Sequence, residues 1–139
     1  MKIQSTSPIR ILIVDDNVEI RTALQDALAP IHDFRIVGLA RNGYEGVALA
    51  TNLKPDVILM NCSMPFMNGI DTTRYIKQRL SHTSIFMISA YDDPELIQAA
   101  FDAGVAGYFI KPIYDFEEFE DSIRLVAEMD RHVTAGSRR

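Results

Sequence analysis

Ile11-Leu12-Ile13-Val14-Asp15-Asp16 is the stretch that decides the fold, because an unbroken apolar run ends abruptly in two carboxylates. An apolar run without alternation is typical of a strand that is covered on both faces of a parallel sheet. The carboxylates then stand at the carboxyl end of the strand, which is the edge where open α/β sheets bind ligands. The stretch therefore predicts a buried parallel strand that ends in a polar site.

Short apolar runs recur along the rest of the chain, each bounded by polar turn residues. Segments with apolar residues at a helical period separate these runs. Pro30 follows the first such segment, Asp93-Pro94 opens a later one, and Gly104 stands where that one would end. The alternation of strand and helix therefore repeats along the whole chain. Strands are predicted at residues 11–14, 34–39, 57–60, 85–88 and 108–110.

The helical segments indicate how they pack. Two of them carry an apolar stripe that should face a core. Alternating strands and helices are joined by right-handed crossovers, which place helices on both faces of a parallel sheet. We therefore predict an α/β fold, a doubly wound (βα)5 five-stranded parallel sheet with the flavodoxin-like order 2-1-3-4-5. The two stripes are Val18, Arg21, Leu24 and Leu28, and Phe116, Phe119, Ile123 and Val126.

The composition fits one globular domain, since the 139 residues are 47% hydrophobic and 24% charged. We expect a domain at 10–129 that is preceded by an N-terminal extension at 1–9. Because the apolar period ends after Met129, we expect a tail or the start of a linker at 130–139. A net charge of -5 disfavours direct binding to nucleic acid. Without a membrane-spanning run or a signal peptide, a cytoplasmic protein with no membrane contact is expected.

Asp15 and Asp16 are the first candidates for chemistry, because adjacent carboxylates at the end of a buried strand repel each other. At 4 Å and an effective dielectric constant of 20, the repulsion is roughly 4 kcal/mol, which a cation would relieve. Mg²⁺ prefers oxygen ligands and is often held by one or two carboxylates. The alternative is that the two acids only cap the helix that follows them.

Polar side chains also follow three other predicted strands. Asn61, Ser89 and Lys111 stand at the ends of the third, fourth and fifth strands. Because parallel strands end at one edge of a sheet, these groups should meet Asp15 and Asp16 there. Two acids, an amide, a hydroxyl and an ammonium at one edge indicate a pocket for a metal ion and an oxyanion.

Together these motifs resemble the receiver domain of two-component response regulators, the CheY-like superfamily, over about residues 10–129. The resemblance implies a signalling role in a phosphorelay, in which a sensor histidine kinase or a phosphotransfer protein donates a phosphoryl group. The motifs are Ile11-Leu12-Ile13-Val14-Asp15-Asp16, Asp56-Val57-Ile58-Leu59-Met60-Asn61 with Met64-Pro65 and Asn68-Gly69, Ser89-Ala90, and Tyr108 with Lys111-Pro112.

The resemblance also assigns roles to the residues of the pocket. Asp15 and Asp16 would organise Mg²⁺, together with Asn61 and the backbone carbonyl of Ser63. The ammonium of Lys111 would contact the phosphoryl oxygens. The Lys111-Pro112 peptide bond resembles one that is cis in this family.

The same resemblance implies a switch and an output surface. Ser89 would be the hydroxyl of the switch and Tyr108 its aromatic ring. Phosphorylation would then remodel the face formed by the fourth helix, the fifth strand and the fifth helix. That face would bind a partner protein or an effector domain, or form a homodimer, so the output is an altered surface and the domain is not expected to be an enzyme.

Asn61 departs from the family pattern, because it stands at the position of the phosphoryl-accepting aspartate. A carboxamide cannot form the acyl phosphate that drives the switch. The loss of one negative charge also weakens the attraction for Mg²⁺, so metal binding is expected to be reduced or absent. Two origins stay open: an engineered Asp-to-Asn substitution, or a natural receiver that signals without phosphate.

Three rival functions compete with the phosphorelay receiver. A pseudo-receiver would act as a protein-interaction module and ignore phosphorylation altogether. An aspartyl-type phosphatase would share the α/β sheet but would carry the motif Asp-x-Asp after its first strand. This chain has Asp15-Asp16-Asn17 at that point. A flavodoxin-like flavin module needs a hydroxyl- and glycine-rich phosphate loop at that point, where two aspartates would repel the phosphate.

Overall fold

The structure, a computed structural model, describes residues 7–137, with side chains described over 7–131. The expected N-terminal extension at 1–9 and tail at 130–139 therefore lie partly outside the described residues. Within the described part, the first strand begins at Ile9.

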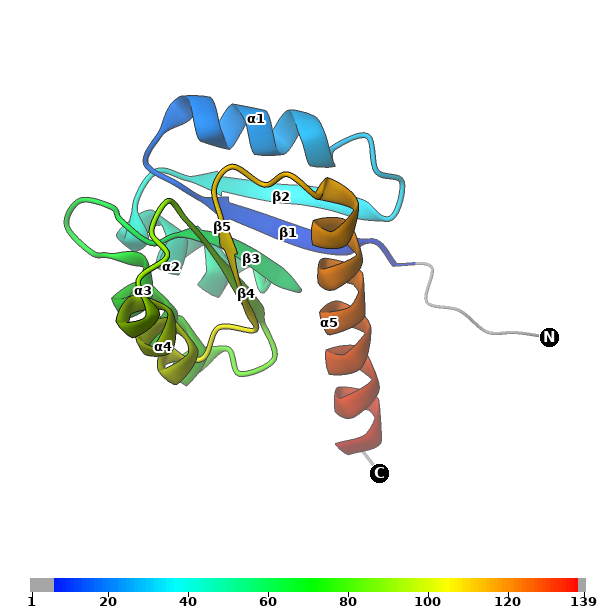
Figure 1. The fold of residues 1–139 in the computed structure, drawn as a ribbon. Helices are drawn as coiled ribbons and strands as arrows, with labels where there is room; N and C mark the ends of the chain where they lie inside the picture. The colour runs from blue at the N-terminus through cyan, green and yellow to red at the C-terminus, as the bar shows by residue number, and fades with distance from the viewer. Residues whose placement is uncertain (1–6, 138–139) are drawn as a thin grey trace.

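Five parallel strands form one sheet at the centre of the molecule, as Figure 1 shows. Their order is β2-β1-β3-β4-β5, so both the predicted fold class and the predicted strand order are confirmed. Every residue of β3 and β4 is buried, which explains why their sequences lack alternation. The strands are β1 (Ile9–Val14), β2 (Phe34–Ala40), β3 (Val57–Asn61), β4 (Ser84–Ser89) and β5 (Gly107–Ile110).

Helices cover both faces of the sheet. Buried side chains of α1 and α5 pack on one face, and buried side chains of α2, α3 and α4 pack on the other. None of the helices in the described part of the chain is both long and apolar enough to cross a membrane. The helices are α1 (Val18–Leu28), α2 (Gly43–Leu53), α3 (Gly69–Arg79), α4 (Pro94–Ala103) and α5 (Phe116–Ser137).

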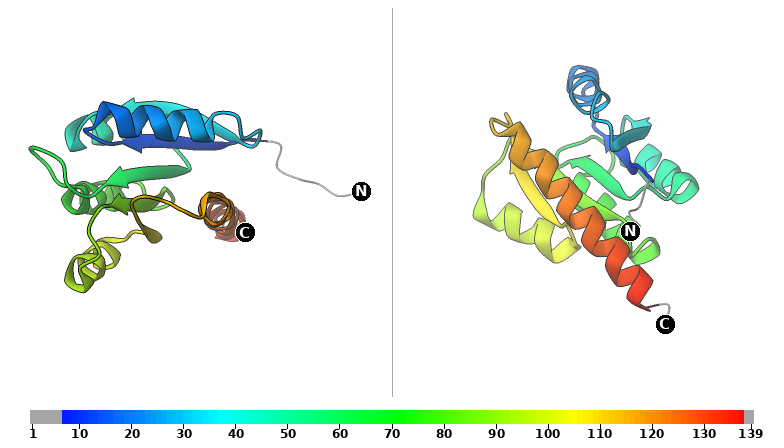
Figure 2. Two further views of the ribbon diagram at one scale, coloured as in Figure 1. Left: turned by 45° about the horizontal axis from the view of Figure 1, so that its top comes forward. Right: turned by 90° about the vertical axis from the view of Figure 1, so that its right-hand side faces the viewer.

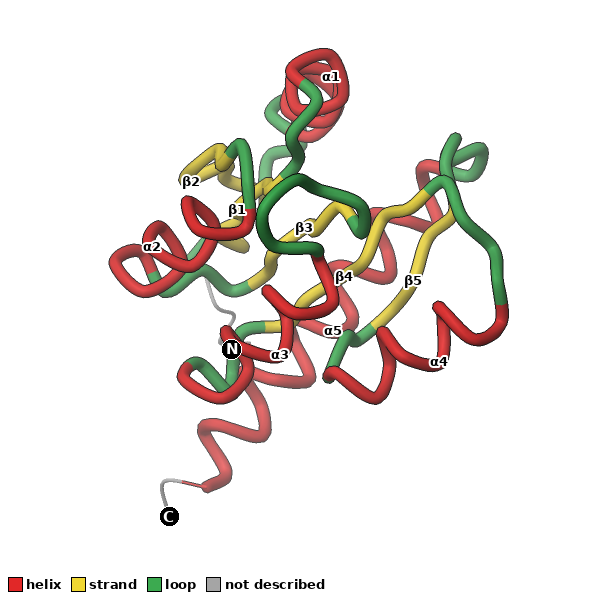
Figure 3. Tube along the Cα trace, turned by 90° about the vertical axis from the view of Figure 1, so that its left-hand side faces the viewer, coloured by secondary structure: helices red, strands yellow, loops and turns green. Residues whose placement is uncertain are grey.

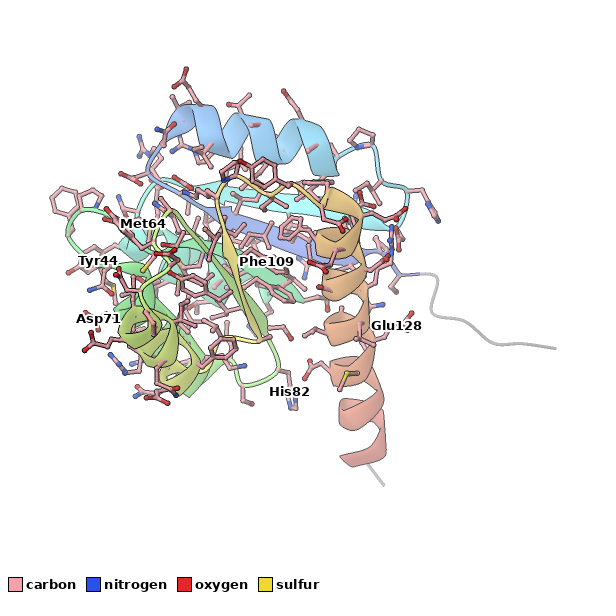
Figure 4. All side chains as sticks on the ribbon, in the orientation of Figure 1. Tyr44, Met64, Asp71, His82, Phe109 and Glu128 are labelled. Carbon is pink, nitrogen blue, oxygen red and sulfur yellow. The ribbon has the colours of Figure 1, made fainter. Side chains whose placement is uncertain are left out.

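The core beneath α1 and α5 confirms the stripe predicted for the last helix. Phe119 and Ile123 are fully buried. The Phe109 ring packs edge-on against Phe119 with the ring centroids 4.9 Å apart, and Figure 4 shows Phe109 between the sheet and α5. The stripe predicted for α1 is only partly correct: Leu28 is buried, but Val18 is 61% exposed. Val18 begins α1 at the polar edge of the sheet, beyond the apolar core.

Helix α5 continues past Met129, where the apolar period of the sequence ends. Figure 2 shows its last turns projecting beyond the sheet. The Arg131 guanidinium donates to the Pro8 carbonyl, just before β1, at 3.0 Å and to the Asp56 carboxylate, just before β3, at 3.2 Å. The expected tail at 130–139 is therefore helical as far as Ser137, and Arg131 joins it to the sheet by long-range polar contacts that have no local sequence pattern.

The carboxyl ends of the strands share one edge of the sheet, and Figure 3 looks onto the loops that follow them. The loop between β3 and α3 folds back over the end of β3, where the Gly69 N–H donates to the Cys62 carbonyl at 2.7 Å. A Cβ atom at Gly69 would overlap the backbone carbonyl oxygen of Asn61. The close approach of α3 to the strand end therefore requires glycine here.

Substitution Gly69→Ala should lower the free energy of unfolding by about 1–3 kcal/mol, since rigid backbone atoms must shift to admit the methyl group. Gly38→Ala is the matched control. Its Cβ would meet the flexible ends of Leu12 and Leu53 at 3.1 Å, so the loss should be smaller. Urea denaturation of both variants measures the difference, and equal losses would contradict the role given to the strand end.

Candidate functional site

Asp15 and Asp16 follow β1 at the carboxyl edge of the sheet. Asp15 is 2% exposed, whereas Asp16 is exposed to solvent. The N-cap of α1 is Asn17, whose side-chain oxygen accepts hydrogen bonds from the backbone N–H groups of Glu19 and Ile20. Asparagine is a favoured N-cap residue, and with the helix capped in this way both aspartates stay available to the site. The alternative in which the two acids cap the helix is not the arrangement seen.

Asp15 is a carboxyl group held in an unfavourable environment. Burial raises the pKa of Asp15 above its ordinary value of 3.8, and the nearby charge of Asp16 adds to this. Two contacts oppose the rise without cancelling it. The Asn17 N–H donates to Asp15 Oδ1 at 2.9 Å, and the Lys111 ammonium lies 3.5 Å from Oδ2. The protein therefore only partly compensates the charge of Asp15.

Asn61 occupies the centre of the site, at the end of β3, and is 8% exposed. Its Nδ2 donates two hydrogen bonds, to Asp16 Oδ1 at 3.0 Å and to the backbone carbonyl of Ser63 at 2.8 Å. Its Oδ1 accepts a hydrogen bond from Lys111 Nζ at 3.0 Å. The carboxamide thus uses both of its N–H groups and its oxygen to join three chain segments.

Ser89 and Tyr108 form a second, neighbouring set of contacts. The Ser89 hydroxyl is buried and accepts a hydrogen bond from the Tyr91 N–H at 3.0 Å. The Tyr108 hydroxyl donates to the Tyr91 carbonyl at 2.7 Å. Burial raises the pKa of the Tyr108 hydroxyl, although the neighbouring Ser89 hydroxyl opposes the rise. Both hydroxyls therefore converge on the loop between β4 and α4.

The structure brings the predicted site residues together in two groups. Asp15, Asp16, Asn61, the Ser63 carbonyl and Lys111 form one hydrogen-bonded network, in which Asn61 has the most partners. Ser89 and Tyr108 lie beside it and meet through the Tyr91 backbone. The Lys111-Pro112 peptide bond is cis.

Sequence reasoning missed two participants. Asn17 both caps α1 and positions Asp15 through its backbone N–H. Its residue type, directly before a helical stripe, was a usable N-cap signal. Tyr91 contributes backbone atoms, which every residue type carries, so no sequence signal could have found it.

Few oxygen atoms in the site could hold a divalent cation. The candidates are the Asp15 and Asp16 carboxylates and the Ser63 carbonyl. Over the described residues there is no cluster of three or more acidic, histidine or cysteine side chains suited to a metal ion. Asn61 turns N–H groups, not its oxygen, towards Asp16 and Ser63. In this arrangement the residues do not fit an ion that Asp16 and Ser63 would bind jointly.

The response regulator receiver domain family matches the chain over residues 11–124. The chain belongs to this family. The receiver domain is 35% identical over 120 residues to the transcriptional regulatory protein LiaR of Bacillus subtilis (strain 168), a match that covers 86% of this chain and 56% of LiaR. It is 37% identical over 119 residues to protein-glutamate methylesterase/protein-glutamine glutaminase 2 of Methanospirillum hungatei, covering 83% of this chain and 34% of that protein. The receiver domain therefore spans between about a third and about half of these relatives.

Solved receiver structures share the fold. The response regulator domain of Thermotoga maritima CheB superposes with a TM-score of 0.79 at 31% identity, covering 87% of this chain and 97% of that one. A chain of the CheX–CheY–BeF3–Mg²⁺ complex of Borrelia burgdorferi superposes with a TM-score of 0.78 at 25% identity, covering 86% of this chain and 90% of that chain. The family resemblance seen in the sequence is therefore confirmed at the level of the fold.

Substitution Asp15→Asn should stabilise the receiver domain by about 1 kcal/mol near neutral pH in a metal-free buffer, since it removes an incompletely compensated buried charge. A raised folded-state pKa means that folding favours the protonated carboxyl. The wild-type domain therefore loses stability as pH rises from 3.8 through the folded-state pKa. Guanidinium denaturation at about pH 7 and again well below the ordinary aspartate pKa of 3.8 measures the effect.

Asp26→Asn is the matched control, because Asp26 is exposed on α1. It should change stability by less than about 0.5 kcal/mol at either pH. The gain from Asp15→Asn should disappear at the lower pH, where Asp15 is neutral in the folded and unfolded chains alike. A gain that persists there would show that burial of charge is not its cause.

Proposed function

We propose that this receiver domain is the phosphoacceptor-type module of a two-component phosphorelay response regulator, held in the unphosphorylated form by Asn61. One observation carries the proposal. Asn61 lies at the end of β3 in direct contact with Asp16, the Ser63 carbonyl and Lys111. An aspartate there would point a carboxylate oxygen at Lys111, as a phosphoryl acceptor paired with a cationic group requires.

Each residue of the pocket has a role in this proposal. Asp15, Asp16 and the Ser63 carbonyl are the metal-binding groups that the family uses for Mg²⁺. Lys111 neutralises the phosphoryl oxygens. A carboxamide at position 61 is neutral and forms no acyl phosphate, so phosphotransfer stops at this residue, whether it is an engineered substitution or a natural one.

Output passes through the face formed by α4, β5 and α5. Each of these elements carries a large exposed apolar side chain, and the three are Phe101, Ile110 and Leu125. Exposed apolar groups of this size favour contact with another protein. Ser89 and Tyr108 are the switch residues, and they connect the pocket to this face through the backbone of Tyr91.

The partners follow from this role. A sensor histidine kinase or a phosphotransfer protein is the donor, and an effector domain, a partner protein or a second copy of the chain reads the face. The longer relatives, which include a transcriptional regulator and a methylesterase, support an effector domain elsewhere in the full protein. The receiver domain itself acts by binding in the cytoplasm, with no catalytic turnover, no nucleic-acid contact and no membrane contact.

A phosphorylation-independent pseudo-receiver is the second candidate. The network around Asn61 favours it, because all three hydrogen-bonding groups of the carboxamide are satisfied without a phosphoryl group. In that case the same face binds its partner constitutively.

Acetyl phosphate with Mg²⁺ separates the two candidates. The Asn61→Asp variant should gain one phosphoryl group by intact mass and change its association in light scattering, while the original chain should do neither. Asn52→Asp, a change of the same kind on the exposed part of α2, should behave like the original chain. Absence of a phosphoryl group on Asn61→Asp would instead support the pseudo-receiver.

A further inference from the structure

We infer that the carboxamide of Asn61 takes the place of the divalent cation in the pocket and blocks the binding of the ion there. The inference rests on the proposed function only in taking Asp15, Asp16 and the Ser63 carbonyl as the metal-binding groups. It concerns an internal substitute for a cofactor, which is a different question from whether the domain accepts phosphate.

The amide nitrogen of Asn61 contacts the same oxygens that would bind a cation. Asp16 Oδ1 and the Ser63 carbonyl oxygen offer lone pairs, which a cation would use as ligands. Asn61 Nδ2 lies 3.0 Å from the first oxygen and 2.8 Å from the second, and it donates a hydrogen bond to each. A cation coordinated by both oxygens needs the space between them, and the –NH₂ group occupies that space with its partial positive charge.

The carboxamide of Asn61 cannot turn over to make room for an ion. Its oxygen faces Lys111 Nζ at 3.0 Å, and an ammonium can only donate hydrogen bonds. A flipped amide would set its –NH₂ group against the Lys111 ammonium and its oxygen against the oxygens of Asp16 and Ser63. All three contacts would become repulsive, so Lys111 fixes the orientation in which Asn61 blocks the ion.

The charges of the pocket are partly balanced without an ion. Lys111 lies 3.5 Å from Asp15 and offsets part of its charge, while one N–H of Asn61 donates to Asp16. An aspartate at position 61 would add a third carboxylate and increase the negative charge that a cation would have to neutralise. With asparagine, hydrogen bonds inside the protein offset part of the charge that the ion would otherwise neutralise.

This inference differs from a simple loss of charge, and the difference can be measured. If reduced metal affinity came only from the missing carboxylate, Asn61→Ala would bind a cation as weakly as the original chain, because both side chains are neutral. If the carboxamide blocks the ion, Asn61→Ala should bind it more tightly, since Asp16 and Ser63 are then free to coordinate.

The experiment is a titration with Mn²⁺, followed by electron paramagnetic resonance of the free ion. Asn61→Ala should bind Mn²⁺ about tenfold more tightly than the original chain. This factor corresponds to the net free energy of the Asn61 hydrogen bonds, which the ion no longer has to break. Asn61→Asp should bind more tightly still. Asn52→Ala is the matched control and should equal the original chain. Equal affinities of Asn61→Ala and the original chain would overturn the inference.

A second measurement needs no substitution, in case Asn61→Ala proves unfolded by circular dichroism. In ¹⁵N-correlated NMR spectra of the original chain, saturating Mg²⁺ should shift the Asn61 side-chain –NH₂ signals together with the backbone signals of Asp16 and Ser63, because the ion and the amide exclude each other. Shifts at Asp16 and Ser63 with the Asn61 –NH₂ signals unmoved would show the ion and the amide bound side by side and would contradict the inference. Phosphorylation of Asn61→Asp tests the proposed function separately, because it does not depend on how Asn61 itself behaves.

Discussion

The parallel register of four neighbouring strands is the constraint on which the site depends. Val14 of β1 pairs with Met60 of β3, Asn61 pairs with Ile88 of β4, and Ser89 pairs with Ile110 of β5. β1, β3 and β4 are buried among apolar neighbours, so a slip by one residue would turn their side chains to the opposite face. The register therefore fixes the positions of the groups at the strand ends. Hydrogen bonds between these groups then decide which of them are in contact.

At the carboxyl edge of the sheet, like charges are brought close together and a neutral side chain lies between one of them and a cation. Two adjacent aspartates, one of them buried, stand beside a single ammonium. The neutral carboxamide of Asn61 contributes no charge, yet it donates to Asp16 and accepts from Lys111 at the same time. A dipole that serves an anion at one end and a cation at the other lowers the cost of keeping both close together.

The contacts around Tyr91 extend this order from the pocket towards the surface. The backbone of Tyr91 binds the hydroxyl of Ser89 through its N–H and the hydroxyl of Tyr108 through its carbonyl. The end of β4, the loop that leads to α4 and the middle of β5 are therefore linked by two hydrogen bonds. A change at the end of β4 has a physical route to β5 and its exposed neighbours.

The sequence by itself determined the fold class and the residues that stand at the strand ends, because uninterrupted apolar runs and helical stripes are local consequences of burial. The predicted strand order came from the usual topology of a five-stranded doubly wound sheet. Only the tertiary structure decided the direction of the Asn61 amide, which depends on donors and acceptors that are distant in the chain. The roles of Tyr91 and of Arg131 also escaped the sequence. Their contacts involve backbone atoms or partners more than a dozen residues away, and neither leaves a periodic pattern that a sequence can reveal.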